Sequence, residues 1–297
     1  MERQQADPET LRLMIALEEA LNSGMTAMAE QIAEIIARRA DKDTSAALAE
    51  AFAIITAFFV YMATTTRETQ RNIAQAQVNR FLGQYDDLLR RAGATAVERN
   101  AFTQKLQEYP NRVNRAFFKK PFPVDNVAFD VRIKTIRDGT QRTVRNIVRN
   151  GTARGESARV MARKVESYLK PGFVGAKVEP LKEARIANSL DKRAKPLGVR
   201  KGSIPYNAIR IARTESAETY RASHVQMYEG TRVEGGKYDW VLSNSHAGPD
   251  RCDDLAKRSP YDGTKRPHSH PNCLCDFRKR PPTLAEVRKL LQEQRNR

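Results

Sequence analysis

The sequence predicts a mainly α-helical protein, in which a long helical N-terminal region is followed by a small α+β C-terminal domain with a loop rich in cysteine and histidine. Over the first 110 positions, apolar residues recur at the three- and four-residue spacing of amphipathic helices. Residues 238–242 have the aromatic and β-branched character of a strand. The stretch from His246 to Asp276 holds all three cysteines and three of the four histidines of the chain.

The positive charge of the chain is concentrated in its middle. Residues 1–110 carry 12 basic and 15 acidic side chains, residues 111–210 carry 24 and 8, and residues 211–297 carry 16 and 12. A basic block of this length attracts phosphate backbones or acidic protein surfaces, whereas a short basic run is usually a solvated helix face. We therefore expect a nucleic acid or an acidic protein as a partner.

Helix signals fill the N-terminal region. Asp7-Pro8 predicts a helix start, because aspartate caps a helix and proline fits its first turn. A second helix is expected over about 25–40, and a third, rich in alanine, from about 44 to 66 with a polar continuation. No catalytic motif accompanies these helices, which favours a role as scaffold or interaction arm.

One segment of this region, Ala51 to Thr66, contains no charged residue and is bounded by Glu50 and Arg67. A membrane-spanning helix needs about 20 predominantly apolar residues, and this run is shorter. We therefore expect a buried helix of a bundle or an oligomer and no stable membrane span. The alternative is a membrane-active segment over 44–66.

Composition divides the chain into four parts. Residues 1–120 form a helical arm for oligomerisation or docking, and Pro121-Phe-Pro123 marks the linker at which the charge changes sign. A basic helical part covers 121–235, short β-strands with the Cys/His cluster cover 236–282, and a basic helix covers 283–297. The three cysteines are too few, and the chain too long, for a disulfide framework, so we expect reduced thiols and synthesis in a cytoplasm.

Helix signals continue through the end of the arm and into the basic part. The capping box Thr95-Ala-Val-Glu98 predicts one helix, and Ser157 is expected to cap another that follows a turn at Gly151 and Gly155. Basic side chains gather on these helices and on the irregular stretch after them, and those expected to bind nucleic acid or an acidic partner are Arg142, Arg145, Arg149, Arg159, Arg163, Lys192, Arg193 and Lys195.

The Cys/His stretch has the residue types of a zinc site. Zinc takes four nitrogen or sulfur ligands in a tetrahedron, and two ligand clusters joined by a loop stiffened by prolines can supply them. The preferred ligands are Cys252, His270, Cys273 and Cys275, with His268 and His246 in reserve. Reduced cysteines without a metal are the alternative, because position 255, where a Cys-x2-Cys pair would have its second cysteine, is leucine.

The histidines of this stretch also allow a catalytic role. His246, His268 and His270 could supply a general base or hold a catalytic metal in a nuclease or other hydrolase. The chain carries no nucleophile elbow, P-loop, His-Glu-x-x-His motif or dinucleotide loop. We therefore expect a protein that is not an enzyme.

The order of several motifs resembles the phage minor head protein family, the Mu F-like head morphogenesis proteins. The matching features are Ile211-Ala-Arg-Thr-Glu215, a strand with Trp240, and the close His270-Pro-Asn-Cys-Leu-Cys275. An upstream Asn-Gly turn followed by an amphipathic helix is similar too, so that the resemblance covers about residues 125–280. The family often has a cysteine where this chain has Leu255, which makes a histidine ligand more necessary.

The resemblance implies a structural virion component located inside the head near the portal. Such a protein would contact the portal protein, the major capsid or scaffold protein and packaged DNA, and would aid head assembly, packaging or ejection. The N-terminal arm would then dock on a protein ring or form a homo-oligomer, and the basic block would face DNA or an acidic protein surface.

Overall fold

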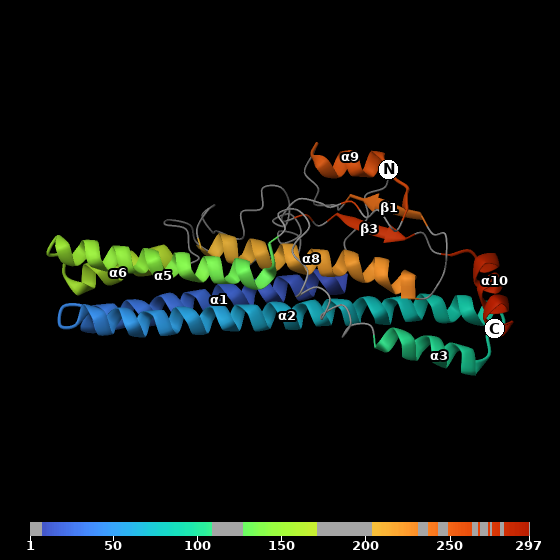
Figure 1. The fold of residues 1–297 in the computed structure, drawn as a ribbon, viewed down its shortest axis with the longest axis horizontal. Coiled ribbons are helices and arrows are strands. Elements are labelled where there is room, and N and C mark those ends of the chain that lie inside the picture. The colour runs from blue at the N-terminus through green and yellow to red at the C-terminus, as the bar shows by residue number, and fades with distance from the viewer. Residues whose placement is uncertain are drawn as a thin grey trace.

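The computed structural model describes residues 8–108, 127–170, 204–230, 237–242, 249–262, 267, 273, 275–279 and 282–296. Within these ranges the chain forms eight helices and one three-stranded sheet. The sheet lies in the C-terminal part, on the side of the helices shown at the top in Figure 1. The predicted fold class, mainly α with a small strand-containing C-terminal region, is confirmed.

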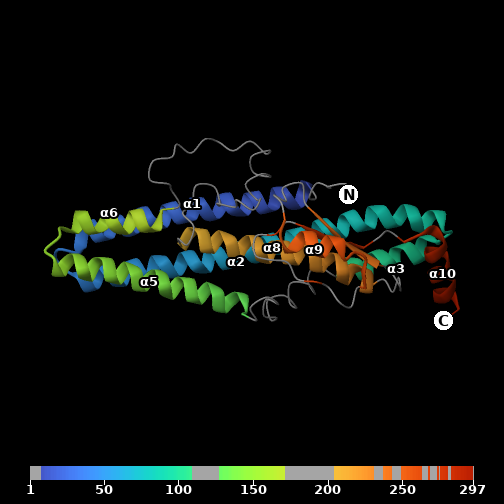
Figure 2. The ribbon, with the colours of Figure 1, turned by 90° about the horizontal axis from the view of Figure 1, so that it is seen from above.

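Two long helices, α1 (Pro8–Arg39) and α2 (Thr44–Arg91), form an antiparallel hairpin that runs along the molecule (Figures 1 and 2). With 48 residues, α2 is about 72 Å long. It starts where the Asp43 side chain accepts a hydrogen bond from the backbone N–H of Ala46 at 2.9 Å. The predicted start of the first helix at Pro8 is confirmed, while the adjoining Asp7 lies outside the described residues.

The predicted division of the first helix is wrong, because α1 continues through Ser23-Gly24 without a break. The rings of Phe58 and Tyr61 on α2 lie against this glycine, where a Cβ would be only 3.2 Å from a carbon of each ring. Gly24 therefore serves close helix packing, which outweighs its low helix propensity.

Helix α2 is the described helix that is long and apolar enough to cross a membrane by length and composition. Of its most apolar window, 39% is buried inside the protein. The buried side is made of residues that pack into the bundle core, among them Ile55, Phe59 and Met62. The expected absence of a stable membrane span stays a prediction.

The helices α5 (Phe129–Ala153) and α6 (Ala158–Leu169) lie along the α1–α2 hairpin (Figure 2). One hydrophobic core contains residues of α1, α2, α5, α6 and α8 (Ile204–Gly230). Helices on both sides of residue 120 thus share a core. The four-part division of the chain stays a prediction, and its proposed linker at Pro121-Phe-Pro123 lies outside the described residues.

The turn between α5 and α6 follows the sequence prediction in its position and differs in its capping. Gly155 has a φ of +69°, which favours glycine. Ser157 precedes α6 but makes no capping hydrogen bond with its side chain. The backbone N–H of Ala158 instead donates to Asp41 Oδ1 at 2.8 Å, so that the α1–α2 turn caps α6 from across the bundle.

At the far end of α2, the short helices α3 (Ala96–Gln107) and α10 (Leu284–Arg295) come together (Figure 1). The predicted capping box of Thr95 and Glu98 is present, and α10 begins with a second one. Arg295 of α10 donates to Glu98 Oε1 at 2.8 Å and to the Gly93 carbonyl oxygen at 2.9 Å. This contact joins the C-terminal helix to the start of α3.

Helix α8 is enclosed by other elements over most of its length. Every residue from 212 to 223 is buried, including Arg213, Glu218 and Arg221. Charged side chains are rarely buried unless they are paired. Arg213 meets this condition through Glu18 of α1, to which its guanidinium donates two hydrogen bonds.

The sheet consists of β1 (Lys237–Val241), β2 (Tyr261–Asp262) and β3 (Asp276–Lys279), in the order β2-β1-β3 with both pairs antiparallel. The predicted strand around 238–242 is therefore confirmed, and β3 at Phe277 lies within the region 236–282 for which short strands were predicted. Trp240 pairs with Phe277 in the register of β1 and β3. A short helix, α9 (Arg251–Lys257), lies against this sheet where the sequence had predicted only a loop.

Candidate metal centre

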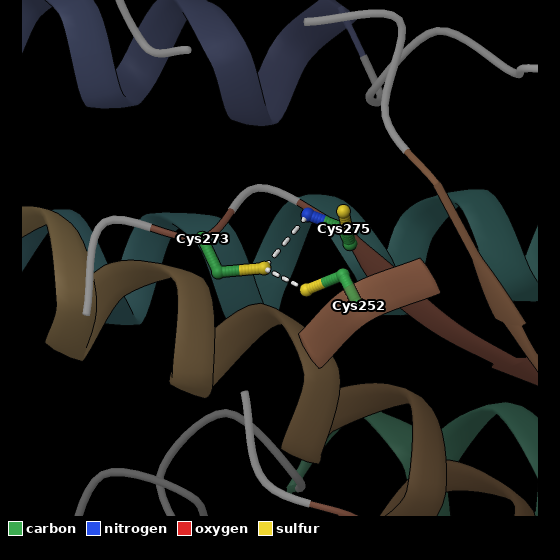
Figure 3. A group of neighbouring side chains, drawn as sticks. All are labelled: Cys252, Cys273 and Cys275. Carbon is green, nitrogen blue, oxygen red and sulfur yellow. Dashed lines mark hydrogen bonds between the residues drawn. The ribbon is translucent and has the colours of Figure 1, made fainter. Parts of the chain in front are cut away.

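The three cysteines converge from two elements onto one buried point (Figure 3). Cys252 comes from the first turn of α9, and Cys273 and Cys275 come from the segment that leads into β3. Their Sγ atoms all lie within 4.8 Å of one another, and those of Cys252 and Cys273 are 3.3 Å apart. We call these three residues the cysteine cluster.

A local signal places Cys252 on its helix. Asp250 and Asp253 form a capping box in which the Asp250 carboxylate accepts a hydrogen bond from the backbone N–H of Cys252 at 2.7 Å. The hydroxyl group of Tyr261 in β2 donates to the carbonyl oxygen of Leu255 at 2.6 Å and ties α9 to the sheet. The Asp-x-x-Asp spacing was available in the sequence and was missed, because the usual box has Glu or Gln at its third helical position.

The environment of the cysteine cluster is apolar and closed. The three side chains are at most 4% exposed and share a hydrophobic cluster with Trp240 and Phe277. The thiols are reduced, since 3.3 Å between sulfurs is far longer than the roughly 2.05 Å of a disulfide bond.

A buried arginine of α8 holds the backbone around two of the cysteines. Arg221 Nε donates to the carbonyl oxygen of Cys275 at 2.8 Å, and Nη2 donates to that of Cys273 at 2.5 Å. Its third nitrogen, Nη1, donates to Glu218, and the guanidinium lies 5.7 Å from the centroid of the Trp240 ring. Burial alone would lower the pKa of Arg221, but the Glu218 carboxylate and other neighbours raise it above the ordinary value.

A second network fixes the start of β3. Asp276 is 4% exposed and accepts hydrogen bonds from the Tyr220 hydroxyl at 3.1 Å and from Arg278. Asp276 follows Cys275 directly, so this network limits the movement of the cysteine cluster on one side. Sequence reasoning missed the roles of Tyr220, Arg221 and Asp276, because their partners lie about 50 residues or more away in the chain.

The electrostatics favour a neutral thiol at Cys252 unless a cation is bound. The pKa of Cys252 is raised above its ordinary value, first by its hydrogen bond with Cys273 and then by that with Cys275 and by burial. Three thiolates so close together would repel one another, and a metal ion removes that repulsion. One favourable contact is already present, since the backbone N–H of Cys275 points to Cys273 Sγ at 3.3 Å. The cysteine cluster is therefore compatible with a metal ion.

Of the predicted metal ligands, the structure brings together the three cysteines. The predicted histidine ligand His270 and the reserves His268 and His246 lie outside the described residues. Among the residues that the structure describes, no other group of three or more cysteine, histidine or acidic side chains is arranged to hold a metal.

The predicted basic residues fall on exposed helix surfaces where they are described. Arg142, Arg145 and Arg149 of α5 are all exposed, and the guanidinium of Arg145 lies 5.0 Å from the ring centroid of Phe52 on α2. Residues 159 and 163 of α6, both arginine, are exposed as well. The remaining predicted residues of this set, Lys192, Arg193 and Lys195, lie outside the described residues.

Comparison with protein-family models, with curated proteins and with solved structures found no match. The function proposed below therefore rests on the residues of this chain and on the resemblance of its motifs.

Proposed function

We propose that this chain is a structural component of a phage head, of the minor head protein family that its motifs resemble, and that its cysteine cluster holds one structural zinc ion. The observation that carries the metal assignment is the convergence of three buried sulfur atoms within 4.8 Å. The cluster joins α9, the segment before β3 and the arginine of α8. A metal there would hold α9 and the segment before β3 together, and Arg221 links that segment to α8.

Zinc is the metal that fits this ligand set best. Structural zinc sites take four cysteine or histidine ligands, while catalytic sites keep an open position for water or substrate. The cysteine cluster is buried among aromatic side chains, which favours a closed, structural site. His270, which precedes Cys273 by three positions, is the proposed fourth ligand, with His268 and His246 as alternatives.

The proposed role in the virion is supported by the exposed arginines on α5 and α6 together with the motif resemblance. A row of guanidinium groups suits contacts to phosphates, which do not depend on base sequence. The long α1–α2 hairpin offers an extended surface on which a portal or capsid protein could dock. On this proposal the chain is not an enzyme, and it acts through contacts with packaged DNA and with the head proteins, as a homo-oligomer inside the capsid near the portal.

Metal analysis of the purified full chain tests the metal assignment. We expect about one zinc per chain, in line with a four-ligand structural site, and a loss of metal and of thermal stability in Cys252→Ser. Ala256→Ser is the matched control, because it places a hydroxyl group at a buried position one turn further along α9. A wild-type chain without bound metal, or equal metal content in Cys252→Ser and the wild type, would contradict the metal assignment.

The virion role is tested separately in assembled particles. Mass spectrometry of purified heads should detect the chain at low copy number, and cross-linking should join it to the portal protein. Absence of the chain from particles, or its presence only in the cytoplasm of the producing cell, would refute the virion role and leave the metal site standing.

A further inference from the structure

The guanidinium of Arg221 uses all three of its nitrogens inside the protein. The side chain is 3% exposed, and each nitrogen has a described acceptor. Nε and Nη2 donate to the carbonyl oxygens of Cys275 and Cys273, and Nη1 donates to Glu218. One planar group thus connects α8 to both cysteines of the Cys-x-Cys segment.

This arrangement fixes the direction of two metal ligands. The guanidinium is a rigid fork, so two carbonyl groups bound to adjacent nitrogens are held in one orientation relative to each other. The side chains of Cys273 and Cys275 leave the same backbone segment, and their Sγ atoms lie within 4.8 Å of that of Cys252. Without the guanidinium, the two carbonyl groups could turn toward other hydrogen-bond donors. The sulfur atoms of Cys273 and Cys275 would then no longer be held toward Cys252.

We propose that Arg221 is the positioning residue of the cysteine cluster. This role rests on the metal site proposed above. Arg221 aligns Cys273 and Cys275 with Cys252 before the ion binds, and its permanent positive charge offsets the negative charge of the thiolates. Glu218 and the Trp240 ring hold the guanidinium in place from its other sides.

Lysine cannot replace arginine in this role. An ammonium group is a point charge on a flexible stem and has no planar fork with which to span two carbonyl oxygens. Arg221→Lys would therefore keep the charge and lose the alignment, which separates the two contributions of the side chain.

The test compares two pairs of substitutions on α8. Arg221→Met with Glu218→Gln removes the buried ion pair that touches the cysteine segment. Arg213→Met with Glu18→Gln is the matched control, because it removes a buried ion pair eight positions earlier on the same helix, with no described contact to a cysteine. Both variants lose one arginine and one carboxylate, so a general loss of stability affects both.

The first readout is metal affinity, measured by competition with a chromophoric chelator for zinc and by the thiolate-to-metal absorption bands of bound cobalt. Residues that orient metal ligands typically change affinity by about 10–100-fold. We expect a loss of this size in the Arg221 pair, a smaller loss in Arg221→Lys, and wild-type affinity and cobalt bands in the Arg213 pair. Equal affinity in the Arg221 and Arg213 pairs would overturn the positioning role while the metal site stood.

The second readout needs no metal. In the metal-free chain, Cys273 and Cys275 should react faster with iodoacetamide in the Arg221 pair than in the Arg213 pair, because the segment that carries them is released. If the wild type binds no metal but this difference is found, the proposed zinc site fails and the positioning role stands. If the reaction rates are equal, the positioning role fails whether or not metal binds. Should the Arg221 pair not fold, Arg221→Lys against the wild type gives the same comparisons.

Discussion

The ion pair between Arg213 on α8 and Glu18 on α1 should respond very differently to the loss of one partner and to the loss of both. Each side chain is 1% exposed. Arg213 Nη2 donates to Glu18 Oε2 at 2.7 Å, and Nε donates to the other carboxylate oxygen. Arg213→Met removes the cation and leaves a carboxylate buried among the helices without its counter-charge.

The expected magnitudes follow from this geometry. Removing one partner of a buried pair costs about 3–5 kcal/mol, because the remaining charge is uncompensated. Arg213 Nη1 has no hydrogen-bond partner within the described part of the chain, so the pair itself is incompletely satisfied. Replacing both partners by apolar side chains, as in Arg213→Met with Glu18→Leu, should therefore restore stability to the wild-type level or exceed it by about 1–4 kcal/mol.

Urea unfolding followed by far-ultraviolet circular dichroism measures both effects. The slope of the unfolding free energy against urea concentration should be the same in all variants. A shifted midpoint then reports a change in stability and not in the surface exposed on unfolding. Metal content must be equal in all samples, because a ligand bound to the folded state adds to apparent stability. A single variant within about 1 kcal/mol of the wild type, or a double variant no more stable than the single one, would refute the reasoning.

Three further predictions concern other parts of the molecule. Glutamine at each exposed arginine of the α5 row should lower the salt dependence of binding to duplex DNA. The slope of the logarithm of the binding constant against the logarithm of the salt concentration should become smaller by up to about 2.7, because three phosphate contacts are lost. An unchanged slope would exclude the row from the interface. The residues of this row are Arg142, Arg145 and Arg149. Gly151→Ala should destabilise the chain by about 1–3 kcal/mol in thermal unfolding, because its Cβ would lie 2.5 Å from Met161 Cγ. The matched Gly139→Ala has no neighbour within 4 Å of its Cβ and should not destabilise, so equal effects would contradict the packing argument. The hydrogen bond from Arg295, together with those from Thr95, lowers the pKa of Glu98 from 4.5 to about 2, so these contacts contribute stability above pH 4.5 that is lost as the pH falls toward 2. Arg295→Gln should raise that pKa toward 4.5 in an NMR titration, and an unchanged value would assign the shift to the capping box alone.

The helical framework was predictable where a local signal exists. The capping box at Thr95 and the proline at position 8 place helix starts correctly, since both act within a few residues. The separate helix expected over about 25–40 is wrong, because the helix continues through Gly24, which lies against the rings of Phe58 and Tyr61 on α2. A glycine that ends a helix and one that admits a neighbouring helix look the same in a single sequence.

The candidate site was predictable in its ligands and not in its supports. Cysteine is a typical metal ligand and is rare in this chain, so the three cysteines in one short stretch predict a metal site from the sequence alone. Arginine and glutamate on a helix are usually solvated, and therefore nothing in the sequence marked Arg221 or Glu218 as buried. Only the packing of the sheet on α8 reveals that Arg221 contacts the cysteine segment and that Glu218 contacts Arg221.

Helix α8 explains why these supports lie where they do. Its two buried arginines stand eight positions apart, and one reaches α1 while the other reaches the cysteine segment. The helix is thus the described element that joins the bundle to the cysteine cluster by charged hydrogen bonds on both sides. Because a buried charge is costly unless its partner is in place, each arginine requires the correct docking of a separate element. A metal ion that orders the cysteine segment would therefore also favour the docking of that segment on α8 through Arg221, so its effect would extend beyond the sheet.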